Sequence, residues 1–236
     1  MGEGLIARYS GGATGARRAA ASGATVVIVD AYRASTTVAV LVSKGARVIP
    51  VASLDEAAMV EADFRVGERG SAKLAGFDFG NSPTDLQNAE VPTGSTVALT
   101  TTNGTRVVEA ASGAPAILTG AFVNAHALAR ELSEQENGSE IMVVGCCWEG
   151  RRASEDEVAS GAILHHLQKF GAKLDERAER VANLYLRHAK QSLKNNSAAR
   201  RLKRLGYERD LDFCLSEDIL PVVPRLEDGT FVEGRK

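Results

Sequence analysis

The sequence predicts an α/β protein with three layers (α/β/α), in which a mostly parallel sheet lies between helices, followed by a helical C-terminal portion and a short β hairpin. Three observations support this prediction. Residues 24–29 form a continuous apolar and β-branched run, which is typical of a strand buried on both faces. Similar runs recur along the chain. They alternate with helical patterns, and such alternation favours parallel strands joined by crossover helices.

The length and composition predict one folded unit. The chain has 236 residues, and we expect residues 1–236 to form a single unit, with a possible subdivision into an α/β core at 1–170 and a C-terminal part at 171–236. Hydrophobic residues make up 44% and charged residues 25% of the chain. These values exclude disordered and fibrous classes of protein.

The net charge and the cysteine content indicate which binding partners and which cellular location to expect for the protein. Lys and Arg number 28 and Asp and Glu number 30, so the net charge of −2 lacks the basic footprint of a nucleic-acid-binding protein. Three cysteines cannot all pair within one chain, and their spacing does not match a zinc site. We therefore expect a cytoplasmic protein without a nucleic-acid or membrane partner, and a homodimer is one option for its assembly.

The first half of the chain contains the clearest helix signals. The strand at 24–29 ends at Asp30, and Ser35 is expected to cap the helix that follows. Ser53 and Glu56 have the spacing of a capping box, in which each side chain satisfies a backbone donor of the other. The elements predicted here are the strand 24–29, the helix 35–44 with Gly45 as its stop, the strand 47–51 and the helix 53–64.

The segment 67–83 is predicted to be a long glycine-rich loop without regular structure. Loops of this length are uncommon unless they are functional. The elements predicted after it are the strand 96–101, the helix 105–112 stopped by Gly113, the strands 116–119 and 141–145, a helix capped by Ser154 with Glu157, the helices 175–191 and 197–205, and a hairpin at Asp228-Gly229.

The interval between Glu179 and Glu208 is basic and contains no acidic residue. We interpret it as a solvated helix face rather than an RNA contact, because charge runs on helices usually mark solvent exposure and no interleaved aromatic platform accompanies this one. Attraction of an anionic small molecule to it stays open. Its basic residues are Arg180, Arg187, Lys190, Lys194, Arg200, Arg201, Lys203 and Arg204.

Polar loops follow three of the predicted strands. In open α/β sheets, ligands bind outside the carboxyl ends of the strands, near helix N-termini. The loops at 30–37, 100–105 and 146–156 are therefore expected to meet there, with the segment 67–83 folded over them. They bring hydroxyls, backbone donors, guanidinium groups and carboxylates together. This mixture suits a phosphate group and a hard cation, and phosphate-ester chemistry is the function that it indicates.

The same segments carry a resemblance that runs in order from Val26 to Gly161 and continues in the C-terminal tail. The chain resembles the 2-phosphosulfolactate phosphatase family. The resemblance implies a Mg²⁺-dependent acid phosphatase that hydrolyses (R)-2-phospho-3-sulfolactate to sulfolactate and phosphate, a step toward coenzyme M. The segments that carry it are residues 29–37, 67–70 with Lys73, 76–83, 100–105, Gly150 with Glu155-Asp156, 210–214 and 221–224.

From the residues and the resemblance together we assign candidate roles. Mg²⁺ on Asp30, Glu68 and Asp156 would orient the attacking water and offset charge at phosphorus. Arg69 and Lys73 are candidates for the sulfonate and carboxylate of the substrate. The catalytic candidates are Asp30, Arg33, Glu68, Asn103 and Asp156, and the substrate-binding candidates are Ser35, Thr36, Arg69, Lys73, Asn81, Thr101, Thr102, Gly104 and Thr105.

Alternative mechanisms and functions remain open on the sequence. An aspartyl-phosphate route through Asp30 normally needs a second Asp two positions later, where this chain has Tyr32. Cys146 and Arg152 match the Cys-x5-Arg spacing of cysteine-based phosphatases, but the residues that usually flank that motif are absent. Other functions that the sequence allows are a phosphatase of another small phosphorylated acid and a non-enzymatic anion-binding or RNA-binding protein.

Overall fold

The structure, a computed structural model, describes residues 4–134, 139–187 and 190–234 and has the predicted α/β/α class. The strands are β1 (Ile6–Gly11), β2 (Thr25–Val29), β3 (Arg47–Pro50), β4 (Phe64–Arg69), β5 (Ala72–Lys73), β6 (Thr96–Thr100), β7 (Ile117–Thr119), β8 (Glu140–Gly145), β9 (Lys173–Leu174), β10 (Pro224–Glu227) and β11 (Thr230–Glu233). The helices are α1 (Gly12–Ala21), α2 (Ala34–Ser43), α3 (Leu54–Met59), α4 (Pro83–Asn88), α5 (Gly104–Ala110), the 3₁₀ helix η1 (Phe122–Asn124), α6 (Ala125–Ser133), α7 (Ser154–Lys169), α8 (Glu176–Arg187), α9 (Lys190–Leu193), α10 (Ser197–Arg204) and α11 (Glu208–Cys214).

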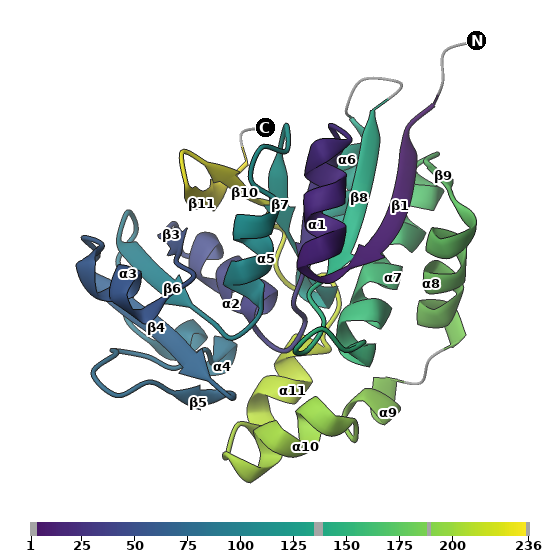
Figure 1. The fold of residues 1–236 in the computed structure, drawn as a ribbon. Helices are drawn as coiled ribbons and strands as arrows, with labels where there is room; N and C mark the ends of the chain where they lie inside the picture. The colour runs from purple at the N-terminus through teal and green to yellow at the C-terminus, as the bar shows by residue number, and fades with distance from the viewer. Residues whose placement is uncertain (1–3, 135–138, 188–189, 235–236) are drawn as a thin grey trace.

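The sheet consists of two parallel blocks joined by an antiparallel hairpin. Its strand order is β5-β4-β6-β3-β11-β10-β7-β2-β8-β1-β9. The pairs β4–β6 and β3–β6 are parallel, and so are the pairs within the block from β7 to β9. The C-terminal hairpin β10–β11 pairs antiparallel with β7 on one side and β3 on the other. Helices α2, α5 and α7, which follow strands of both blocks, nevertheless begin close together near the centre of Figure 1.

Two apolar cores lie on opposite faces of the sheet, and β2 contributes to both. All five residues of β2 are buried. Val27 and Val29 pack with α6, α7 and α8, whereas Val26 and Ile28 pack with α1, α2 and α5. Because side chains alternate along a strand, a strand that is covered on both faces needs apolar residues at every position. This explains the uninterrupted run that predicted the strand.

Most predicted elements are confirmed within a few residues, and so are several of the local signals. The capping box of Ser53 and Glu56 forms at the start of α3. Gly45 and Gly113 have positive φ angles where their helices end, and Asp228 and Gly229 form the positive-φ turn of the hairpin.

Other predictions are wrong. The helix predicted at 53–64 ends at Met59, and Phe64 begins strand β4. The segment 67–83 is not free of regular structure, because β4 extends to Arg69, β5 pairs with it and α4 begins at Pro83. The elements β1, α1, α6 and α11 were not predicted.

The predicted caps of α2 and α7 are also wrong. Arg33 and Ala153 occupy the two N-cap positions, and neither makes a side-chain capping bond. The Ser35 hydroxyl is instead directed at the end of β2, where it accepts from the Asp30 N–H at 2.8 Å. Ser154 is already the first helical residue of α7.

The C-terminal helices lie beside the ends of the strands. In Figure 1, α10 and α11 lie below the point where α2, α5 and α7 begin, and α11 packs against α4. The last part of the chain therefore contributes both to the middle of the sheet and to its functional edge. None of the described helices is both long enough and apolar enough to cross a bilayer.

Candidate active site

A small buried pocket lies where the loops after β2, β4, β6 and β8 meet. We call it the acidic pocket, because four carboxyl side chains line it. Its volume is about 20 Å³, which is room for a water molecule or an ion. Its lining residues are Asp30, Tyr32, Arg33, Glu68, Ser71, Asn81, Asn103, Cys147, Trp148, Ala153, Glu155 and Asp156.

Two of the carboxylates are held by backbone donors. Glu68 accepts from the N–H groups of Thr102 at 2.6 Å and Ser71 at 2.5 Å, one on each oxygen. Asp156, in the first turn of α7, accepts from the N–H groups of Ala31 at 2.9 Å and Cys147 at 3.1 Å. Burial nevertheless raises the pKa of Asp156 well above its usual range, and the carboxylates nearby add to the rise.

Asp30 keeps one carboxylate oxygen available. Its Oδ1 accepts from the Ala34 N–H at 3.3 Å, so Asp30 helps to cap α2, while Oδ2 accepts from no donor among the described residues. The pKa of Asp30 is raised to about 7, chiefly by burial and in smaller part by the charges of Glu68 and Glu155, against the opposing backbone hydrogen bond from Ala34. Gly104 allows α5 to approach closely, because a Cβ atom there would lie 3.0 Å from Asp30 Oδ2.

Glu155 is a pocket residue that was not among the candidates. It is buried, and its Oε2 accepts from the side-chain amide of Asn196 at 2.7 Å. Burial raises the pKa of this carboxyl too. The signal that could have identified it is its place beside Asp156 in the first turn of a helix that begins at the site.

Arg33 lies in the wall of the pocket and is almost completely buried. Its Nη1 donates to Asp210 Oδ2 at 2.6 Å and its Nη2 to the Ser71 carbonyl oxygen at 2.8 Å. The guanidinium also stacks on the Tyr207 ring at 4.2 Å. These contacts orient the group from three sides, and two of them come from α11 and the residue before it.

Arg201 on α10 is a second arginine at the site. Its Nε donates to the Ser71 hydroxyl at 2.9 Å, and its guanidinium lies 3.7 Å from the centre of the Trp148 ring. Arg201 is half-buried, in contrast to the solvated face that we predicted for the basic interval. Trp148, Asn196 and Asp210 were likewise not predicted as site residues, because their roles depend on how the C-terminal helices pack.

The structure brings some candidates to the pocket and not others. All five catalytic candidates line it, and Asn81 does so among the substrate-binding candidates. Arg69 instead donates to its neighbour's carbonyl and to Thr100, and the exposed Lys73 donates to the Asp78 carbonyl oxygen. The remaining candidates do not line the pocket and support its loops through local hydrogen bonds or close packing, namely Ser35, Thr36, Thr101, Thr102, Gly104 and Thr105.

The donor set of the pocket suits a hard cation. Among the described residues, no three His, Cys, Asp or Glu side chains form a ready-made metal cage. Mg²⁺ does not require one, because it is usually held by one or two carboxylates together with water and substrate oxygens. The free Oδ2 of Asp30 and the buried Oδ1 of Asn81, which has no hydrogen-bond partner among the described residues, are oxygen ligands of this kind.

The two cysteines beside the pocket are not arranged for thiolate chemistry. Burial raises the pKa of Cys146 well above its usual range and raises that of Cys147, so both remain thiols near neutral pH. Arg152 does not reach over Cys146 and instead pairs with Glu157. The Cys-x5-Arg spacing therefore has no corresponding phosphate-binding geometry here.

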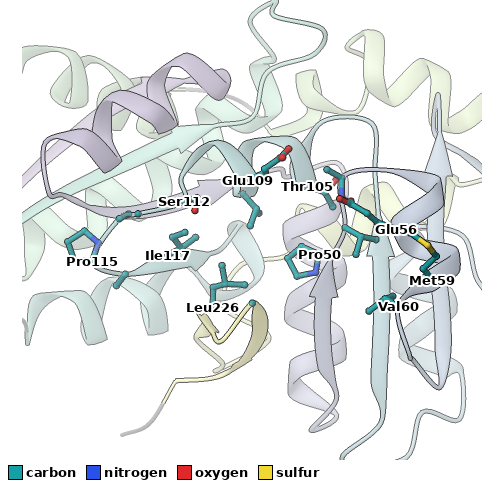
Figure 2. A pocket seen from close by; sticks show the side chains of 17 residues that line it. Pro50, Glu56, Met59, Val60, Thr105, Glu109, Ser112, Pro115, Ile117 and Leu226 are labelled. Carbon is teal, nitrogen blue, oxygen red and sulfur yellow. The ribbon is translucent and has the colours of Figure 1, made fainter.

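A larger groove of about 780 Å³ lies elsewhere, between α3, α5 and the β10–β11 hairpin. Figure 2 shows that Pro50, Ile117 and Leu226 form its floor and that Glu56 and Glu109 stand at its edge. None of the described residues that line it is basic. Two carboxylates without a compensating cation repel a phosphate ester, so this groove is not suited to one.

The fold and the acidic pocket define an α/β protein with a small polar site at the carboxyl edge of its sheet, which is suited to a phosphorylated compound and a cation. The model of the 2-phosphosulpholactate phosphatase family matches residues 14–229. The chain therefore belongs to this family of phosphoric monoester hydrolases.

Individual relatives cover most of the chain. A protein of Thermotoga petrophila named probable 2-phosphosulfolactate phosphatase is 36% identical over 216 residues, which are 88% of this chain and 91% of the relative. Proteins of the same name from Thermosynechococcus vestitus and Trichormus variabilis are 37% and 35% identical, over 84% and 87% of this chain and 87% and 90% of their own lengths.

Proposed function

We propose that this protein hydrolyses (R)-2-phospho-3-sulfolactate to 3-sulfolactate and inorganic phosphate with Mg²⁺, a reaction of the coenzyme M biosynthesis type. The observation that supports the proposal is the acidic pocket with its buried arginine, in a chain whose relatives carry the name of this activity. Four carboxyl groups around so small a volume favour a bound cation, because the Arg33 guanidinium offsets only part of their mutual repulsion.

Asp30 is the proposed base. In the reaction a water oxygen forms a bond to phosphorus, the bond from phosphorus to the ester oxygen breaks, and the leaving oxygen takes up a proton. A carboxylate oxygen has more than one lone pair, so Asp30 can bind the ion and still accept a proton from a water held beside it. Its Oδ2, which accepts from no described donor, is the atom available for both roles.

Arg33 and Asn103 are proposed to bind the phosphoryl group. Arg33 has both a fixed orientation and a permanent charge, and charge stabilisation of this kind strengthens toward the transition state. Asn103 lines the pocket at the N-terminus of α5 and accepts from the Glu149 N–H at 3.4 Å through Oδ1, which leaves its amide N–H groups to donate.

Asp30, Glu68 and Asp156 are the proposed protein ligands for Mg²⁺, with Asn81 as a further oxygen donor. When bound, Mg²⁺ would supply positive charge beside the phosphoryl oxygens and so lower the cost of the charge that develops there. The backbone bonds to Glu68 and Asp156 would keep these carboxylates in place in the absence of the ion.

The test is phosphate release from a panel of phosphorylated acids, with Mg²⁺ and after chelation by EDTA. We expect turnover of 2-phosphosulfolactate that chelation abolishes and Mg²⁺ restores. Efficient turnover of a different phosphorylated acid, with little on 2-phosphosulfolactate, would transfer the proposal to that substrate. Undiminished turnover after exhaustive chelation would contradict the role of the metal ion.

A further inference from the structure

The acidic pocket is too small to hold a whole organic acid, and this raises the question of where the rest of the substrate lies. The pocket has about 20 Å³ of space, whereas an adjoining cavity has about 250 Å³. The two share Trp148, Ala153 and Glu155 in their linings. A substrate can therefore lie in the second cavity, which we call the outer cavity, with its phosphoryl group at the shared wall and directed at the acidic pocket.

The arginines of the two cavities differ in how much hydrogen-bonding capacity remains. Arg33 uses Nη1 and Nη2 on Asp210 and Ser71. Arg152 pairs with Glu157 through Nε and Nη2, and 72% of its side chain is exposed. Arg201 uses only Nε, on the Ser71 hydroxyl, so its two terminal amino groups have no acceptor among the described residues.

Arg201 is also held in a fixed orientation. Its guanidinium lies on the Trp148 ring, and the Trp148 backbone is fixed by two hydrogen bonds of 2.8 Å with Arg151. A planar fork that is held by stacking and one hydrogen bond, with two amino groups free, is preorganised for an anion with several oxygens. The Glu155 carboxylate in the same cavity is engaged by Asn196 and Ser154 through Oε2.

Ser71 connects this arginine to the proposed chemistry. Its hydroxyl accepts from Arg201, its carbonyl oxygen accepts from Arg33, and its N–H donates to Glu68. One residue therefore joins the phosphate-binding arginine, a proposed metal ligand and Arg201. Because both guanidinium groups contact this one residue, the arginines of the two cavities are neighbours, an arrangement that suits a small molecule with two anionic groups.

We propose that Arg201, stacked on Trp148, is the specificity-determining residue that binds the sulfonate of the substrate in the outer cavity. This inference rests on the proposed function and replaces Arg69 and Lys73, which the structure does not bring to the pocket. A sulfonate has three oxygens and a charge that persists at every relevant pH. A permanently charged guanidinium fork is the side chain that matches it.

The experiment compares two substrates that differ only in the sulfonate, 2-phosphosulfolactate and 2-phospholactate. Arg201→Ala should raise KM for 2-phosphosulfolactate tenfold or more, with a smaller effect on kcat. The factor by which it raises KM for 2-phospholactate should be at least tenfold smaller. Arg201→Lys should recover only part of the loss, because a point charge cannot donate as a fork. Equal penalties of Arg201→Ala on both substrates would overturn the inference.

Two further variants make the comparison sharper. Arg204→Ala removes the same charge from an exposed position on the same helix and should leave both KM values unchanged. Arg106 lines a different cavity, of about 520 Å³, that also adjoins the acidic pocket through Asn103 and Cys147. A sulfonate-selective penalty from Arg106→Ala, and none from Arg201→Ala, would assign the sulfonate to that cavity instead.

A binding measurement separates this inference from the proposed function. Absence of turnover of 2-phosphosulfolactate by the wild-type protein would contradict the proposed function. Calorimetric titration with 3-sulfolactate then decides the inference by itself. Binding to the wild-type protein that is at least tenfold tighter than to Arg201→Ala supports it. Equal affinities, or no binding to the wild-type protein, overturn it, provided that the thermal unfolding of both proteins shows intact folds.

Discussion

Arg33 and Asp210 form a completely buried ion pair across 177 residues of sequence, with Arg33 Nη1 2.6 Å from Asp210 Oδ2. The other carboxylate oxygen of Asp210 accepts from the hydroxyls of Ser82 and Thr84 and from the Thr84 N–H. The pair therefore connects the loop after β2, the start of α4 and helix α11. A charge at the site is therefore held in place by a helix that contributes no described residue to the lining of the acidic pocket.

Removal of one partner of this pair should destabilise the protein strongly. Asp210→Ala leaves the Arg33 charge buried without a counter-ion, and we expect the free energy of unfolding to fall by about 3 to 5 kcal/mol. Urea unfolding at neutral pH measures the loss. A decrease below about 1 kcal/mol would show that Arg33 finds another partner or is not buried in solution.

A double variant separates the stability of the pair from its role in catalysis. In Arg33→Met with Asp210→Leu, apolar side chains of similar volume replace both charges, and such replacements are often neutral or stabilising. Much of the stability should return while phosphate release stays low. Recovery of activity together with stability would remove Arg33 from the proposed phosphate site.

The sequence allowed the acidic half of the site to be predicted, and the reason is local. Asp30 follows β2 directly, Asn103 lies in the loop after β6, and Asp156 lies in the first turn of the helix that follows β8. All three strands have strong apolar patterns, and in parallel blocks these positions lie at the carboxyl edge. Arg201 and Asp210 could not be found in this way. Their partners, Ser71 and Arg33, are 130 and 177 residues away, and only the packing of α10 and α11 brings them together.

The fold shows the same division between local and distant determinants. Strand β2 was predicted because both of its faces are covered and every residue is apolar. Strand β4 was missed, because its first residue, Phe64, was assigned to the preceding helix and residues 67–69 to the glycine-rich loop. No glycine or proline marks the end of α3, and pairing with β6 decides the conformation of β4. Helix α1 lacks a side-chain cap and begins with two glycines separated by small residues, so its sequence carries little helical signal.

Close packing of α7 against α8 predicts that Gly161 tolerates no side chain. A Cβ atom at Gly161 would overlap the carbonyl oxygen of Val181 and lie 2.8 Å from the Cβ of Tyr185. Gly161→Ala should lower the free energy of unfolding by about 2 kcal/mol, despite the better helix propensity of alanine. Gln168→Ala, at an exposed position of the same helix, is the matched control. Equal stability of the two variants in urea would contradict this packing.

The cysteines beside the pocket are predicted to be dispensable for turnover. Their pKa values are raised by burial and by nearby carboxylates, so neither is a thiolate nucleophile near neutral pH. Replacement of Cys146 and Cys147 together by Ala should retain most of kcat. A loss of about a thousandfold in a folded protein would point to a covalent thiol mechanism instead.

The raised pKa of Asp30 predicts how stability changes with pH. Its pKa is about 7 in the folded protein and 3.8 in the unfolded chain, so the folded state binds the proton more tightly. The contribution of Asp30 to the free energy of unfolding is fully present below pH 4 and is lost as the pH rises through about 7. Asp30→Asn should remove this part of the pH dependence, whereas Asn at the exposed Asp85 should not. Identical pH profiles for the wild-type protein and Asp30→Asn would contradict the raised pKa.

The same reasoning predicts the effect of Mg²⁺ on thermal stability, which can be measured without any turnover. Above pH 7 Asp30 is ionised beside Glu68 and Glu155, and a cation that binds only the folded protein offsets this repulsion. Mg²⁺ should therefore raise Tm by several degrees at pH 8 and by much less at pH 5, where a proton occupies Asp30. Asp30→Asn should show a smaller rise at pH 8, since it has lost a ligand. A rise in Tm of equal size at both pH values, or one that is undiminished in Asp30→Asn, would place the cation away from this carboxylate.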